Sequence, residues 1–81
     1  MPSLQQAPRM IRAKLDVGIL PHDAMARMSV GGGRGESCDG CEGAILPTQV
    51  EYEIDVSGRT LRFHRGCAAL WEAGRRQAPA A

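Results

Sequence analysis

Two short residue pairs constrain this chain more than any other feature: Cys38-x-x-Cys41 and His64-x-x-Cys67. Together they contain all three cysteines and one of the two histidines. Thiolate sulfur and neutral imidazole nitrogen are ligands of Zn²⁺, and a gap of two residues lets a tight turn or a first helical turn direct both side chains at one ion. Four protein ligands complete a tetrahedral site. The pattern therefore predicts one structural zinc ion held by Cys38, Cys41, His64 and Cys67.

The three cysteines have two other uses that the sequence leaves open. Cys38 and Cys41 alone could form a redox pair, but such a pair belongs to a thioredoxin-like sandwich, for which a chain this short offers little room. That interpretation also leaves His64 and Cys67 without a role. Alternatively, all three cysteines are ordinary buried residues. A complete disulfide framework is excluded because the number of cysteines is odd.

Composition limits the size of the core and the class of partner. The 81 residues suffice for one small domain with one Phe, one Tyr and one Trp, and such domains are marginally stable without a metal or a disulfide. The net charge of +1 indicates neither a strong nucleic-acid binder nor an acidic tail. Lys14 is the only lysine, and the abundance of Arg, Ala, Gly and Pro is typical of GC-rich bacterial coding. No apolar run reaches membrane length and no secretory pattern is visible at the N-terminus, so a cytoplasmic protein is expected.

The first residues are expected to form a tail and then an amphipathic helix. Residues 1–8 lack periodicity and contain two prolines, which predicts a disordered tail. From residue 9 on, apolar residues that include Ile11 and Leu15 recur at helical spacing. Gly18 suits the left-handed position that ends a helix, and Pro follows shortly after it. This pattern predicts a helix over about 9–17.

A further helical turn within residues 21–28 would complete a helical arm over 9–30. Met25 and Met28 would share one face of that turn. Flexible methionines fill gaps in cores or serve adaptable binding surfaces, and both uses remain open here. Residues 31–35, with the sequence GGGRG, lack the lysine and hydroxyl of a phosphate-binding loop. They are expected to form a flexible hinge between the arm and the zinc module.

The strongest strand signal lies in residues 50–56, where apolar residues alternate with acidic ones. Ser57 and Gly58 suit a two-residue turn, and residues 59–63 read as the return strand. The turn places Val56 opposite Arg59, Ile54 opposite Leu61, Glu53 opposite Arg62, Tyr52 opposite Phe63 and Glu51 opposite His64. The apolar pairs then share one face of the hairpin, so turn and pattern agree. The hairpin delivers His64 to the metal.

After the hairpin the pattern becomes helical, with Cys67 and Trp71 on one face. Residues three apart on a first turn are neighbours, so Cys67 can share a metal with His64. Trp71 is expected to fill the core between helix and hairpin. The zinc-binding domain is therefore predicted to span residues 36–76, with a tail at 77–81.

These elements carry a family resemblance. A zinc knuckle, a hairpin and a helix bearing the last ligand follow the order of a treble-clef zinc finger. The motif C-x2-C with Ile45 four residues after the second cysteine, then H-x2-C after 22 intervening residues, resembles the first zinc module of a LIM domain. The likeness covers about residues 36–76 and implies a small α+β zinc-stapled fold. A LIM domain has a second zinc module for which this chain holds no ligands, so no partner is implied. The whole chain also looks like small zinc-binding proteins of GC-rich bacteria, which implies no activity.

The leading hypothesis is a protein-interaction module folded by zinc, with a small bacterial regulator of transcription or stress responses as its most specific form. No enzyme activity is expected, because a closed tetrahedral site leaves no position for substrate and Gly66 stands where a zinc deaminase has glutamate. The acidic strand face, a strand edge and the apolar stripe of the arm would contact the partner, and the arm could also form a homodimer. The candidate partner-binding residues are Ile11, Leu15, Met25, Met28, Glu51 and Glu53.

The alternative hypothesis is a nucleic-acid-binding zinc finger that uses arginines of the C-terminal third. The acidic strand lies close by and would cancel much of their field, and the basic stripe is not continuous. The candidate residues are Arg59, Arg62, Arg65, Arg75 and Arg76.

Overall fold

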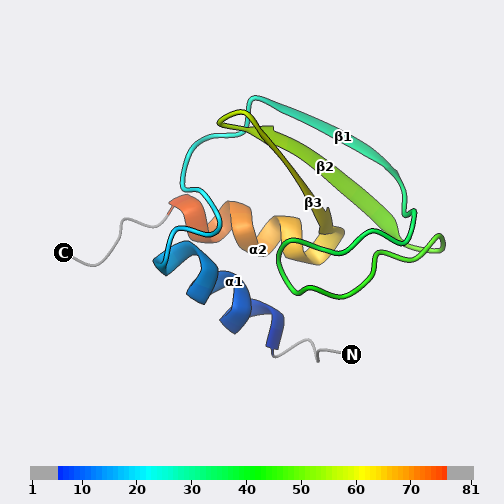
Figure 1. Ribbon diagram of the computed structural model, residues 1–81, viewed down its shortest axis with the longest axis horizontal. Helices are drawn as coiled ribbons and strands as arrows, with labels where there is room; N and C mark the ends of the chain where they lie inside the picture. The colour runs from blue at the N-terminus through cyan, green and yellow to red at the C-terminus, as the bar shows by residue number, and fades with distance from the viewer. Residues whose placement is uncertain (1–5, 77–81) are drawn as a thin grey trace.

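The computed structural model describes residues 6–76, which form a three-stranded antiparallel sheet and two helices (Figure 1). The elements in chain order are α1 (Gln6–Asp16), β1 (Arg27–Gly32), β2 (Val50–Val56), β3 (Arg59–His64) and α2 (Arg65–Arg76). The strand order is β1-β2-β3, α2 lies against β2 and β3, and α1 packs beside α2. This is the α+β class expected from the sequence. The expected tail at 77–81 and the first part of the expected tail at 1–8 lie outside the described residues.

Helix α1 is longer at its N-terminal end than expected and belongs to the core. It begins at Gln6, so the last three positions of the expected tail are helical, because proline is accommodated in a first turn where its missing N–H is not needed. Ala7, Ile11 and Leu15 form a buried stripe at a spacing of four. The helix ends as predicted, with Gly18 at a φ of +83°. Its stripe packs on α2, so α1 is part of the zinc-binding unit.

Strand β1 replaces the expected helical turn and the start of the expected hinge. Residues 27–32 pair antiparallel with β2, with Met28 opposite Ile54 and Val30 opposite Tyr52. The helical interpretation depended on local spacing, whereas a strand is stabilised by its cross-strand neighbours, which lie far away in the sequence. Strand β1 forms one edge of the sheet. Every residue of β1 is exposed, so the strand carries no buried side chain.

Gly33 and Gly35, which follow β1, are required for different reasons, close packing at Gly33 and backbone conformation at Gly35. An ideal Cβ on Gly33 would lie 2.1 Å from the carbonyl oxygen of Leu46. Gly35 has a φ of +81°, which favours glycine, and its N–H donates to the Ile45 carbonyl at 2.8 Å. The segment 33–35 is therefore bonded to the segment before β2, and the prediction of a hinge at 31–35 was wrong.

The hairpin of β2 and β3 has the predicted register at every position. Val56 pairs with Arg59, Ile54 with Leu61, Glu53 with Arg62, Tyr52 with Phe63 and Glu51 with His64. Ser57 and Gly58 have φ values of +50° and +76°, as a type I′ turn requires. Local turn chemistry and the apolar alternation thus specify the same pairing.

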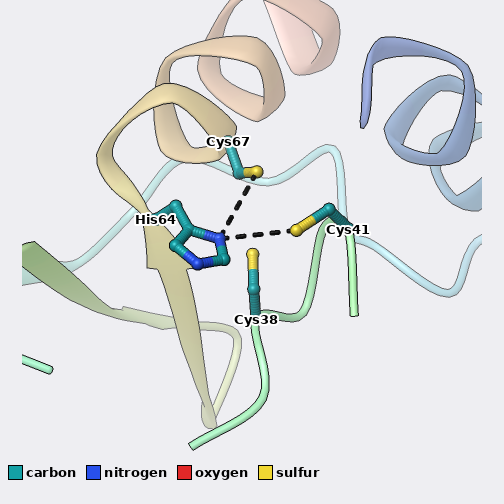
Figure 2. Close-up of side chains that lie close together, drawn as sticks. All are labelled: Cys38, Cys41, His64 and Cys67. Atoms are coloured by element: carbon teal, nitrogen blue, oxygen red, sulfur yellow. Dashed lines mark hydrogen bonds between the residues drawn. The ribbon is translucent and has the colours of Figure 1, made fainter. Parts of the chain in front are cut away.

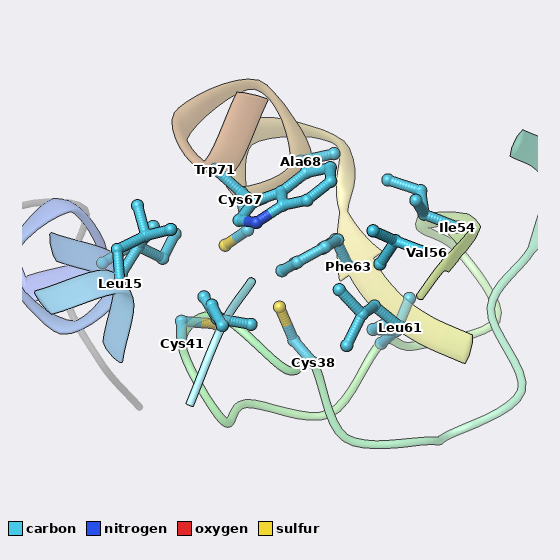
Figure 3. Packing of buried hydrophobic residues seen from close by; sticks show 14 residues of the cluster. Leu15, Cys38, Cys41, Ile54, Val56, Leu61, Phe63, Cys67, Ala68 and Trp71 are labelled. Carbon is cyan, nitrogen blue, oxygen red and sulfur yellow. The ribbon is translucent and has the colours of Figure 1, made fainter. Parts of the chain in front are cut away.

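Trp71 fills the core between α2 and the hairpin, as predicted (Figure 3). Its ring is fully buried and stacks on Phe63 with the ring centroids 5.6 Å apart. The guanidinium of Arg75 covers the ring at 5.5 Å, and the indole N–H donates to the Pro21 carbonyl at 3.0 Å. This hydrogen bond ties the connection after α1 to the core.

No helix in the described residues is long and apolar enough to cross a membrane.

Candidate metal centre

Cys38 and Cys41 lie in a closed loop on the connection between β1 and β2. The Cys38 N–H donates to the Gly43 carbonyl at 2.8 Å, and the Glu42 N–H donates to the Cys38 carbonyl at 2.9 Å. The Gly40 N–H donates to Cys38 Sγ at 3.4 Å, as expected for a zinc knuckle. The positive φ of this loop belongs to Glu42, at +70°, and not to Gly40 or Gly43.

The knuckle is held against both helices. A Cβ on Gly40 would lie 3.0 Å from the side chain of Ile11 and 3.2 Å from that of Cys67, so glycine gives α1 and α2 room to approach. Lys14 of α1 donates to the Asp39 and Gly40 carbonyls at 3.0 and 3.1 Å. These contacts satisfy knuckle carbonyls that the sharp turn leaves without backbone partners.

His64 and Cys67 reach the same point from the junction of β3 and α2. His64 is the last residue of β3, and Cys67 lies in the first turn of α2. The His64 Nε2–H donates to the Ala44 carbonyl at 3.0 Å. A carbonyl only accepts, so this bond assigns the proton to Nε2 and leaves the lone pair of Nδ1 facing the sulfur atoms. This is the tautomer that binds a metal through Nδ1.

The four predicted ligands are brought together (Figure 2). Their ligand atoms all lie within 4.8 Å of one another. His64 Nδ1 lies 3.4 Å from Cys41 Sγ and 4.0 Å from Cys67 Sγ. Zinc bonds of usual length at tetrahedral angles place nitrogen and sulfur ligands about 3.5 Å apart. The arrangement is therefore compatible with tetrahedral coordination and consistent with one structural zinc ion.

The protonation of the sulfur atoms also favours a cation. A hydrogen bond from Cys67 lowers the pKa of Cys38 to about 4, and backbone N–H groups add to this effect against the cost of burial. The same hydrogen bond, together with burial, raises the pKa of Cys67. Without a cation, one sulfur carries the charge and a neighbour keeps its proton. A divalent ion removes this competition, because it stabilises adjacent thiolates directly.

Asp39 connects the knuckle to the outer side of β3. Its N–H donates to the Arg62 carbonyl at 2.7 Å, and its carboxylate accepts from the Arg62 N–H at 2.7 Å. Asp39 was not among the predicted site residues. The signal was its place inside Cys-x-x-Cys, but its partner on β3 could not be identified from spacing alone.

The proposed contact residues of the arm are divided between core and surface. Ile11 and Leu15 are each only 2% exposed, so the stripe of α1 is not available to a partner or for a homodimer. Met25 packs against the core, whereas Met28 is 47% exposed on β1. The core interpretation therefore applies to Met25 and the surface interpretation to Met28.

The acidic face of β2 is only partly available. Glu51 is 4% exposed, and its carboxylate accepts from Arg34 at 3.0 Å. Glu53 is half-buried and meets the same guanidinium at 3.4 Å. Arg34, which lies in the glycine-rich segment, was missed as a site residue. Its only sequence signal was its position as the single charge among glycines.

The five arginines of the nucleic-acid hypothesis do not form one surface. Arg59 and Arg62 are three residues apart on β3 and so project from opposite faces of the sheet. Arg59 donates to the Ile19 carbonyl at 3.0 Å. Arg75 and Arg76 both pair with Glu72, at 2.6 and 3.1 Å. Arg65 begins α2 and is exposed. Arg75 and Arg76 share one carboxylate, so only part of this positive charge is neutralised within the described residues.

The fold and the site define a small α+β protein whose Cys3His group suggests a structural zinc module. Comparison with protein-family models, curated proteins and solved structures gives no significant match. The function is therefore inferred from the residues of this chain.

Proposed function

We propose that this chain is a treble-clef-like structural zinc module that mediates protein–protein interaction through the free edge of its sheet. The observation that carries the proposal is β1, an edge strand in which all six residues are exposed, Met28 and Val30 among them. Exposed apolar edge strands are used to add a partner strand, which supplies main-chain hydrogen bonds and side-chain contacts.

The order of the elements supports the treble-clef-like part of the proposal. The knuckle, the β2–β3 hairpin and the α2 helix follow one another, and each contributes to the four-ligand group. One ion would join the β1–β2 connection to the end of the hairpin and to α2. Binding free energy of structural zinc is about 10 to 16 kcal/mol in finger peptides, so the ion would dominate the stability of so small a fold.

Metal analysis tests the zinc part. Protein purified under reducing, zinc-replete conditions is expected to contain one zinc ion per chain, and a strong chelator is expected to abolish the cooperative unfolding transition. A metal content near zero, with the same unfolding transition in chelator, would contradict the proposal. Ala69→Ser is the control for substitutions of Cys67, since residue 69 is exposed on the same helix.

Site-specific photo-crosslinking tests the interaction part. A photo-reactive amino acid replaces Val30 on β1 or, as a matched control, the exposed Ala69 on α2. Irradiation of cells that produce the protein is expected to give a defined adduct from position 30, with itself or with another protein, and none from position 69. Equal, diffuse labelling from both positions, or none from either, would contradict an interaction surface at β1.

A further inference from the structure

The two edges of the sheet differ. At the β3 edge, Asp39 bonds to both the N–H and the carbonyl of Arg62, so the middle of that edge is closed by the knuckle. At the β1 edge, no described residue outside β2 forms a backbone hydrogen bond with Met28 or Val30. Strand β1 contains no proline or lysine, the residues that commonly protect an edge from pairing.

The hydrogen-bond parity of β1 identifies the groups that face outward. The Gly33 N–H donates to the Gln49 carbonyl, so the alternate residues Arg27, Ser29 and Gly31 face β2. The N–H and carbonyl groups of Met28 and Val30 therefore point to the free edge. An added strand must form its hydrogen bonds with these residues.

An uncovered apolar strip lies beside that edge. Met28, Val30 and Val50 are 47%, 57% and 41% exposed. They share the face of the sheet that bears Ile54, which is buried. Helix α2 contacts β2 and β3 but not β1, and Figure 1 shows β1 extending past the helix. The strip is therefore continuous with the core but has no cover within the described residues.

We propose that the partner of this edge is a second copy of the chain, with the two β1 strands paired antiparallel about Ser29. The proposal rests on the interaction function proposed above and names its partner. Parity allows registers centred on residue 28, 29 or 30. Centred on Ser29, each Met28 lies opposite Val30 of the second copy. A register centred on Met28 places Val30 opposite Ala26, and one centred on Val30 places Met28 opposite Gly32. Only the register centred on Ser29 pairs both large apolar side chains of each strand with one another.

Charge complementarity supports the same register. A hollow beside β1 is lined by Ser29, Val30, Gly31, Gly32, Arg34, Glu51 and Glu53. Within it, two carboxylates share one guanidinium, at 3.0 and 3.4 Å. The carboxylate of the buried Glu51 has one oxygen with no hydrogen-bond partner in the described residues. On the far side, Arg62 Nε is 4.0 Å from the other oxygen. Because Glu51 Oε1 is itself covered, a further cation can reach this hollow at the half-buried carboxylate of Glu53.

The register centred on Ser29 brings that cation. It places Arg27 of the second copy opposite Gly31, which has no side chain to block it. The α-carbon of Glu53 is then two strand spacings across and two residues along the strand, about 12 Å away, which an arginine side chain, a glutamate side chain and the bond between them span. Arg27 is exposed and forms no ion pair within its own described residues. The twofold axis makes this contact twice.

Sedimentation of the zinc-loaded protein tests the assembly. The mass is expected to rise with concentration from that of one chain to that of two. Val30→Lys is expected to weaken the dimer at least tenfold, because the ammonium would be brought against Met28 of the second copy. Val17→Lys makes the same change at a position that is 70% exposed and remote from β1, and should leave the dimer unchanged. Both variants must keep one zinc per chain.

A disulfide tests the register. Ser29 would face its own copy in a non-hydrogen-bonded pair, whose Cα separation of about 4.5 Å suits a disulfide. Zinc-loaded Ser29→Cys, incubated with oxidised glutathione, is expected to form a covalent dimer. Gly31→Cys should not, because Arg27 of the second copy faces it. Dimers from Gly31→Cys but not from Ser29→Cys would overturn the register.

A charge exchange tests the hollow. Arg27→Glu and Glu53→Arg are each expected to weaken the dimer several-fold, and the double variant to recover most of the loss. Arg9→Glu, an equal charge change on α1, should have no effect. No recovery in the double variant would overturn the assignment of the hollow.

A wild-type protein that stays monomeric at millimolar concentration would overturn the second copy as partner. A crosslink from position 30 to a different protein would leave the interaction function standing.

Discussion

The exchange of Gly33 for alanine provides the sharpest test of how the knuckle is built. An ideal Cβ at residue 33 would lie 2.1 Å from the Leu46 carbonyl oxygen and 2.6 Å from that of Ile45. Carbon and oxygen make contact at about 3.3 Å, so the two backbone segments must separate by about 1 Å. These are backbone atoms, which cannot move aside by a change of rotamer.

The magnitude follows from what that separation breaks. The Gly35 N–H to Ile45 bond of 2.8 Å and the Gly33 N–H to Gln49 bond of 2.9 Å would both be stretched beyond hydrogen-bonding distance. Two such bonds contribute about 2 kcal/mol, and overpacking costs about 1 to 3 kcal/mol. Alanine returns about 0.5 to 1 kcal/mol through the entropy of the unfolded chain. We expect a loss of about 3 kcal/mol.

Urea unfolding of the zinc-loaded protein and zinc competition with a chelating dye measure this loss. Because folding and zinc binding are expected to be coupled, about 3 kcal/mol corresponds to about 100-fold weaker zinc binding. Gly32→Ala is the matched control, since no atom lies within 4 Å of a Cβ there and its φ is not positive. A flexible hinge predicts small, similar effects at both positions. Equal stability of the two variants within about 0.5 kcal/mol would refute the packing argument.

Three further substitutions test the site and the core. Cys67→Ser should weaken zinc binding about 100-fold, since one ligand of four contributes about a quarter of the binding free energy of about 10 to 16 kcal/mol. Zinc competition with a chelating dye measures this loss, with Ala69→Ser as the control. Asp39→Ala should cost about 1 to 2 kcal/mol of unfolding free energy because the Arg62 N–H loses its 2.7 Å hydrogen bond. The control Asp16→Ala removes an exposed ion pair with Arg12 and should cost under about 0.5 kcal/mol. Trp71→Phe should cost about 2 kcal/mol of unfolding free energy, because it leaves the Pro21 carbonyl unpaired and empties part of the core. An unchanged midpoint of urea unfolding would contradict a stabilising role for this hydrogen bond.

The parts of the fold that could be predicted are those whose signals are local. The hairpin combines period-two alternation with a two-residue turn, and both give the same register. That register places His64 at the end of a strand, and a helix that begins at once turns Cys67 to the same side. The ligand group followed from the sequence for this reason, because its spacing and its secondary structure agree.

The parts that could not be predicted depend on contacts between distant residues. Strand β1 is short, ends in two glycines and is separated from β2 by 17 residues, so nothing local outweighs the helical spacing of Met25 and Met28. The burial of Glu51 has the same origin. Its alternation with apolar residues predicts exposure, and the distant Arg34, 3.0 Å from the carboxylate, helps to make its burial tolerable.

The position of the knuckle couples the metal to the β1 edge. Cys38 and Cys41 lie within the connection that joins β1 to β2, and the bridge between Ser37 and Ala44 closes that connection near its middle. A zinc-bound knuckle shortens the loop that β1 must close in order to pair, and so lowers its entropic cost. Strand β1 buries no side chain and contacts only β2, so it has the least protection of any element against local opening. Any partner that binds the edge therefore also stabilises the closed connection, and by linkage raises the affinity of the knuckle for its metal.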